Sequence, residues 1–152
     1  MDRPSSWLDY IFTHELGHVV DMATNVGALW ERVPWDSAPG RWRRKFPTNS
    51  QLIAGSVFEM KDAKNLYSTL EEGATASLYG LCSAGEDFAE SFAIYVLGRE
   101  RGLSLRIQLP GEQAPAVDLV EHLESPAMAV KRDVLGKVVE SLKETARVRF
   151  GR

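Results

Sequence analysis

Residues 6–26 read SWLDYIFTHELGHVVDMATNV, and this stretch decides the fold. Apolar side chains recur along it at roughly helical spacing, a serine at position 5 or 6 can cap its start, and Asn25 with Gly27 supplies a stop. The pattern therefore predicts a helix over 6–26. The recurring apolar residues are Trp7, Leu8, Ile11, Phe12, Leu16, Val19, Val20 and Met22. Of these, Leu16 is expected on the side that faces the core.

Within this helix stands the pentapeptide His14-Glu15-Leu16-Gly17-His18. Residues four apart lie one above the other on a helix, so both imidazoles can reach one metal ion at about 2.0–2.1 Å. Glu15 lies about 100° around the helix, where it can hold a metal-activated water and take its proton. Gly17 allows another element or a substrate to approach closely. The alternative is an ordinary amphipathic helix with two histidines whose hydrogen bonds are satisfied.

A catalytic zinc site needs a third protein ligand and an open position for water. Glu86 and Glu90 are again four residues apart, on a helix predicted at about 85–97 that ends at Gly98. One carboxylate can bind the metal while the other orients a metal-binding histidine through a hydrogen bond. The alternative for Glu86 is a capping box with Ser83 at the helix start. Glu90, beside two phenylalanines, would be costly to bury without a partner such as an imidazole N–H.

The rest of the chain contains further helices and little strand. Prolines, glycines and tryptophans punctuate residues 28–56, which predicts ordered loops with one short helix near 38–46, and a second short helix is expected at 62–70. Alternating apolar residues predict a short strand near 103–109. Ser125-Pro126 starts the last helix, whose apolar stripe comprises Val130, Val134, Leu135, Val138, Val139 and Leu142. The predicted fold class is mainly α, α+β at most, in one domain over 1–152.

Composition excludes several classes of function. The chain has 152 residues, of which 44% are hydrophobic and 26% charged, as in a soluble globular domain. A net charge of −3 argues against a nucleic-acid partner, and no apolar run approaches the roughly eighteen residues of a membrane span. The N-terminus shows no apolar leader. Cys82 is expected to be a packing residue and His122 a surface residue; cellular location and oligomeric state stay open.

Several segments together resemble a known family. The segment His14–Asp21, with Leu70-Glu71-Glu72-Gly73, Tyr79-Gly80 and 86–92 (EDFAESF), resembles the catalytic domain of anthrax lethal factor, and the related Pro-Pro endopeptidases are similar in outline. Tyr79 precedes Glu86 by seven residues, as the family's active-site tyrosine precedes its glutamate ligand. The resemblance covers roughly residues 11–24 and 62–97.

The resemblance implies a zinc metallopeptidase that hydrolyses a peptide or protein substrate, built on the C-terminal helical half of a zincin-like fold. His14, His18 and Glu86 would bind Zn²⁺, and Glu15 would be the general base. Tyr79 would lean over the metal, where its phenol could donate to the oxyanion of a hydrated carbonyl. Glu90 would orient a zinc-binding imidazole, and Asp21 could do the same or be a surface acid of the helix.

The sequence departs from the family in two places. Residues 28–60 lengthen the gap between the two metal-binding helices, and their basic cluster at 41–45 is better explained as a solvated face than as a rim of the substrate groove. Only thirteen residues precede His14, where the family places a β-sheet. We therefore expect either a piece of a longer protein or a reduced domain. Two alternatives remain open: a zinc-stabilised protein-interaction module without turnover, and a metal-free helical domain.

Overall fold

The computed structural model describes residues 6–26, Trp30, Tyr67, 73–108, Gln113 and 117–151. This part of the chain is mainly helical with one small two-stranded sheet, which confirms the predicted fold class. The helices predicted at 38–46 and 62–70 and the basic cluster at 41–45 lie outside the described residues, except for Tyr67. None of the described helices combines the length and apolarity needed to cross a bilayer.

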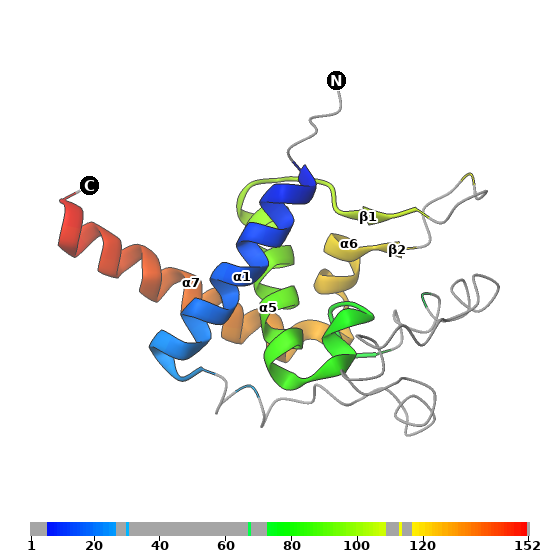
Figure 1. The fold of residues 1–152 in the computed structure, drawn as a ribbon, viewed down its shortest axis with the longest axis horizontal. Helices are drawn as coiled ribbons and strands as arrows, with labels where there is room; N and C mark the ends of the chain where they lie inside the picture. The colour runs from blue at the N-terminus through cyan, green and yellow to red at the C-terminus, as the bar shows by residue number, and fades with distance from the viewer. Residues whose placement is uncertain are drawn as a thin grey trace.

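Helices α1 (Ser6–Thr24) and α5 (Ala84–Ile94) lie side by side and form the most extensive helix pair of the described residues (Figure 1). A β-carbon on Gly17 would lie only 2.9 Å from the Cα of Ala89, so the two backbones meet at this glycine. The expectation that Gly17 permits a close approach is confirmed. Helix α1 ends as predicted, with Asn25 in the left-handed conformation at φ 54°.

The buried face of α1 differs from the predicted one. Its buried residues are Thr13, His14, Gly17 and Val20, a stripe at helical spacing that faces α5. Leu16 is 43% exposed, so the expectation that it faces the core is wrong. The exposed apolar residues of α1 are Trp7, Leu8, Ile11, Phe12, Leu16, Val19 and Met22. The helix therefore presents its polar and small residues to α5 and most of its apolar residues outward.

Helix α5 is the centre of the described core. Ser83 caps its start, and every residue from Asp87 to Ile94 is buried. The helix continues into the π-helix η2 (Tyr95–Glu100), which carries the helical stretch beyond the predicted end at Gly98. Before α5 comes the short 3₁₀-helix η1 (Tyr79–Cys82), which begins at the tyrosine singled out in the sequence.

The predicted strand at 103–109 is shorter in the structure. Strand β1 (Arg106–Ile107) pairs antiparallel with β2 (Val117–Asp118), with Ile107 opposite Val117. Helix α6 (Leu119–Glu124) follows at once, capped by Asp118, whose carboxylate accepts from the backbone N–H groups of Val120 and Glu121. No strand or helix was expected over these residues. The chain turns from β2 directly into α6, which leaves the pairing short.

His122, expected on the surface, is buried on α6 at 4% exposure, and its Nε2 lies 2.7 Å from the carbonyl oxygen of Thr75. The predicted surface position of His122 is therefore wrong, because α6 packs against the segment before η1. After the 3₁₀ turn η3 (Pro126–Met128), helix α7 (Ala129–Phe150) runs across the domain and extends past α1 and α5 (Figure 1). Of its predicted stripe, Leu135 and Val139 are buried, whereas Val130 is 56% exposed.

Candidate metal centre

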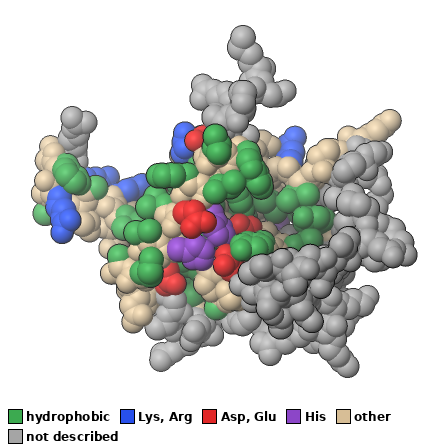
Figure 2. Space-filling model, in the orientation of Figure 1, with side chains coloured by type: hydrophobic (Ala, Val, Ile, Leu, Met, Phe, Trp, Pro, Cys, Tyr) green, Lys and Arg blue, Asp and Glu red, His purple; other side chains and the backbone are tan. Residues whose placement is uncertain are grey.

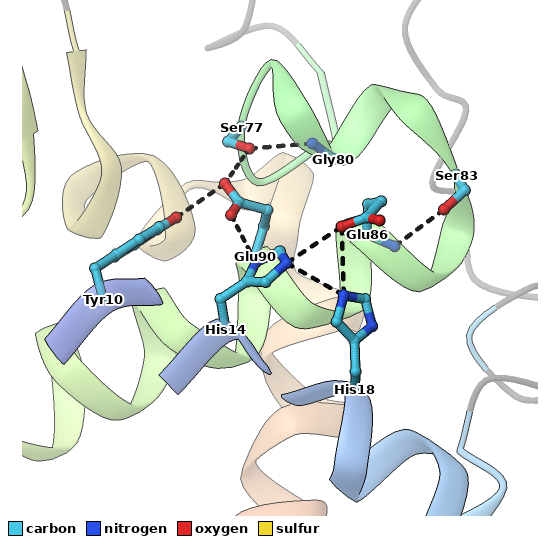
Figure 3. A network of polar contacts seen from close by, with 8 residues as sticks. All are labelled: Tyr10, His14, His18, Ser77, Gly80, Ser83, Glu86 and Glu90. Atoms are coloured by element: carbon cyan, nitrogen blue, oxygen red, sulfur yellow. Dashed lines mark hydrogen bonds and ion pairs between the residues drawn. The ribbon is translucent and has the colours of Figure 1, made fainter. Parts of the chain in front are cut away.

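Three side-chain atoms from α1 and α5 converge on one point. The Nε2 atoms of His14 and His18 lie 3.2 Å apart, and Oε2 of Glu86 lies 3.2 Å from the first and 3.4 Å from the second (Figure 3). In a tetrahedral zinc site with bonds of about 2.0–2.1 Å, neighbouring ligand atoms are about 3.3 Å apart. The triangle formed by these three atoms therefore has the dimensions of one face of such a site, and the three residues can hold a metal ion.

Glu86 is held at the start of α5 by two features of the local sequence. Oγ of Ser83 accepts the backbone N–H of Glu86 at 3.1 Å, which is the cap expected of the Ser83-x-x-Glu86 pattern. The Glu86 carboxylate, however, points toward the histidines (Figure 3). Its Oε2 is buried and accepts no hydrogen bond from any described residue. A buried carboxylate oxygen without a donor is costly, and a cation at the centre of the triangle would remove that cost.

Glu90 fixes the orientation of the His14 ring from one helical turn further along α5. Its Oε1 lies 2.8 Å from Nδ1 of His14, as predicted from the spacing of the two glutamates. An ionised carboxylate only accepts hydrogen bonds, so Nδ1 carries the proton and the lone pair of a neutral ring sits on Nε2. That lone pair points toward Glu86 and His18. The arrangement is the carboxylate–histidine pair that usually supports a metal-binding imidazole.

The other oxygen of Glu90 is occupied by two hydroxyl groups. Tyr10 donates to Oε2 at 2.9 Å from the first half of α1, and Ser77 donates to the same oxygen from the segment before η1. Ser77 in turn accepts the backbone N–H of Gly80 at 3.1 Å. Neither Tyr10 nor Ser77 was singled out in the sequence, because no local spacing connects them to Glu90. Burial opposes protonation of His14, but the hydrogen bond and charge of Glu90 and the charge of Glu86 outweigh it, so the pKa of His14 lies above its ordinary value.

Glu15 and Tyr79 line the same cavity as His14. Glu15 is exposed next to the two histidines, and Figure 2 shows histidine side chains reaching the surface between acidic and hydrophobic ones. Tyr79 is 47% exposed, and its ring centroid lies 5.8 Å from that of His14. Asp21, the other predicted acid, lies outside the group of converging ligand atoms.

A cavity of about 570 Å³ opens beside the triangle. His14, Glu15 and Tyr79 form its wall on the side of the candidate metal centre. The rest of the wall is mostly apolar, with contributions from the first turns of α1, from β1 and from the start of α6. The apolar lining residues are Trp7, Tyr10, Ile11, Tyr67, Leu78, Leu105, Ile107 and Leu119. The cavity has the size and apolar lining typical of a small-ligand or side-chain pocket.

A buried ion pair holds the segment before Ser77 against α5. Asp87 pairs with Lys131 of α7, and both side chains are at most 1% exposed. Asp87 also accepts from the backbone N–H of Ala76 at 3.1 Å and from Nε1 of Trp30 at 2.8 Å. Burial raises the pKa of Asp87 and lowers that of Lys131, and the charge of each partner opposes the shift of the other. This network fixes the backbone at Ala76, one residue before Ser77.

Comparison with known proteins gave no matching family model, no similar curated protein and no similar solved structure.

Proposed function

We propose that this chain is a zinc-dependent metallopeptidase that uses a metal-activated water to hydrolyse peptide bonds. One observation carries the proposal: the two Nε2 atoms and Oε2 of Glu86 form a triangle with edges of 3.2–3.4 Å, in which the buried glutamate oxygen has no hydrogen-bond donor among the described residues. Two histidines and a glutamate are a ligand set of zinc peptidases, in which the fourth position stays open. The resemblance to the lethal factor family supports the same conclusion.

Each residue has a role that follows from its position. When bound, zinc would supply a Lewis acid that activates water and polarises the substrate carbonyl. Glu15, exposed beside the ligands, takes the proton of the attacking water and delivers it to the leaving amine. Tyr79, with its ring 5.8 Å from that of His14, donates its phenol proton in a hydrogen bond to the developing oxyanion. Glu90 keeps the Nε2 lone pair of His14 aimed at the ligand triangle.

The cavity supports a peptide as the substrate. It shares His14, Glu15 and Tyr79 with the proposed catalytic machinery, so a group bound in it lies next to the scissile bond. Its remaining wall is largely apolar, which favours an apolar side chain of the substrate over a charged one.

The test separates metal binding from catalysis. Purified protein loaded with zinc should retain near one equivalent after dialysis, and Glu86→Ala should lose it. Glu15→Gln should keep the metal and abolish cleavage of a peptide library, whereas Glu144→Gln, an exposed carboxylate on α7, should leave both unchanged. Wild-type protein that binds no zinc would refute the proposal. Equal cleavage by wild type and Glu15→Gln would refute the assigned mechanism.

A second candidate is a zinc-stabilised module that binds a protein without cutting it. It is favoured by the outer face of α1, where Leu8, Phe12 and Met22 are 68%, 73% and 77% exposed. Apolar groups of this size in one row mark surfaces that another segment or protein covers. This candidate predicts one zinc per chain with no cleavage of any peptide. Phe12→Asp should then abolish partner binding, whereas the peptidase proposal expects cleavage that survives this substitution.

A further inference from the structure

We infer that Tyr10 and Ser77 are positioning residues that set the metal affinity of the candidate centre through Glu90. Both donate to Oε2 of this carboxylate, whose other oxygen meets Nδ1 of His14. The inference rests on the proposed function only in its choice of zinc as the ligand. It assigns a role to a tyrosine and a serine that are not among the three residues of the ligand triangle.

The first step of the argument is burial. Glu90 is 6% exposed, and burying a carboxylate is costly unless hydrogen bonds replace those it made to water. His14 supplies one donor, and the hydroxyls of Tyr10 and Ser77 supply the others (Figure 3). Without them the carboxylate loses two of the contacts that hold it in place, and its hydrogen bond with Nδ1 of His14 loses its alignment. A poorly aligned acceptor at Nδ1 no longer keeps Nε2, the metal ligand, directed at the ligand triangle.

The second step is geometry. The three donors come from two parts of the chain, because Tyr10 and His14 lie on successive turns of α1 and Ser77 precedes η1. Together they fix the plane of the carboxylate. Ser77 also accepts the backbone N–H of Gly80, the residue after Tyr79. Ser77 therefore connects the orientation of His14 to the turn that carries Tyr79, whereas Tyr10 acts on Glu90 alone.

The test is a double-mutant cycle on zinc affinity, measured by competition with a chelator on the full chain. Tyr10→Phe should weaken zinc binding by about tenfold, within the range for residues that support metal-binding histidines. In a Glu90→Gln background the same substitution should change the affinity less than twofold, because Tyr10 acts through the carboxylate. Tyr95→Phe removes a tyrosine hydroxyl that lies against Gly136 of α7, outside this cavity, and should have no such effect. An equal loss in both backgrounds, or no loss in the wild type, would overturn the inference.

A spectroscopic readout separates positioning from general destabilisation. In zinc-loaded protein, the Nδ1 proton of His14 should exchange slowly with water, and Tyr10→Phe and Ser77→Ala should each speed this exchange. Ser91→Ala is the matched control for the serine, because Ser91 Oγ is buried next to Glu90 and has no hydrogen-bond partner in the described part of the chain. Unchanged exchange in both variants would contradict the inference. Zinc binding without peptide cleavage would refute the peptidase proposal, but the double-mutant cycle on zinc affinity would still test the roles of Tyr10 and Ser77. Failure to bind zinc would refute both.

Discussion

Gly17 lies so close to Ala89 that a β-carbon on the glycine would sit 2.9 Å from the Cα of the alanine. This contact sets the distance between α1 and α5 one residue before His18 and three residues after His14. The helices that carry the ligands are therefore held at the separation at which Nε2 of His18 reaches Oε2 of Glu86 at 3.4 Å. The glycine of the pentapeptide therefore sets the helix spacing at the candidate metal centre.

We expect Gly17→Ala to force the two helices apart. The new methyl group meets backbone rather than a flexible side chain, and overpacking of this kind costs about 1–3 kcal/mol of the free energy of unfolding. Zinc affinity should fall in parallel, since Glu86 moves away from the histidines. Gly85→Ala is the control, because its β-carbon meets only Oγ of Ser83 at 3.8 Å. Urea unfolding and zinc competition of both variants check the prediction; equal behaviour would contradict it.

The spacing of the histidines and of the glutamates predicted that each pair shares one helix face, and the resemblance singled out Glu86 rather than Glu90 as the ligand. Spacing alone did not predict that the two helices meet. Nor was it enough to predict which face of α1 is buried. The apolar pattern placed Leu16 inside, whereas the stripe that meets α5 contains Thr13, His14 and Gly17. The periodicity of a sequence shows where apolar residues recur along a helix. It does not show that the candidate site needs polar residues on the buried face.

Contacts between distant segments had no signal in the sequence. Tyr10 and Glu90 are separated by 80 residues, and Thr75 and His122 by 47, with no spacing rule to connect either pair. Lys131 gave no signal of burial, because lysine is usually exposed, yet it is 1% exposed and paired with Asp87. Such partners follow from the packing of α6 and α7 against α5, which single-helix patterns do not specify.

Metal removal should lower the stability of the folded chain. A ligand that binds only the native state at a hundredfold excess over its dissociation constant adds about 2.7 kcal/mol to the free energy of unfolding. Zinc should therefore raise the melting temperature of the wild type by several degrees, and a chelator should reverse the change. Glu86→Ala should show no zinc-dependent shift in differential scanning calorimetry. A shift of equal size in that variant would place the stabilising ion elsewhere.

Lys131→Met should destabilise the fold severely. The substitution leaves the carboxylate of Asp87 buried without its cation, and breaking a buried pair in this way costs about 3–5 kcal/mol. Lys137→Met, an exposed lysine of the same helix, should change stability by less than about 0.5 kcal/mol. Chemical denaturation of both variants makes the comparison. Similar costs at the two positions would show that the pair contributes nothing specific.

Asp118 should make the stability of α6 depend on pH. Burial acts to raise its pKa, but the hydrogen bonds from Arg106 and from two backbone N–H groups prevail and hold it below the ordinary value. A depressed folded-state pKa means that the stabilisation is present above the unfolded value of about 3.9 and is lost as pH falls through the folded one. Asp118→Asn keeps the cap without the charge, so its stability should fall less steeply below pH 4. Parallel slopes in urea titrations would contradict this assignment.

Ile107 should influence which peptides are cleaved, if the cavity receives a substrate side chain. It lines the same cavity as Glu15 and Tyr79, and each methylene of contact in an apolar pocket is worth about 1–3 kcal/mol of discrimination. Ile107→Ala should therefore lower kcat/KM at least about tenfold for peptides with a bulky apolar residue beside the scissile bond, with less effect on those with alanine there. Val148→Ala, at 78% exposure on α7, removes an apolar side chain outside the cavity and should leave both values unchanged. Zinc content must stay the same in both variants. A uniform loss across all peptides would assign Ile107 to the fold rather than to specificity.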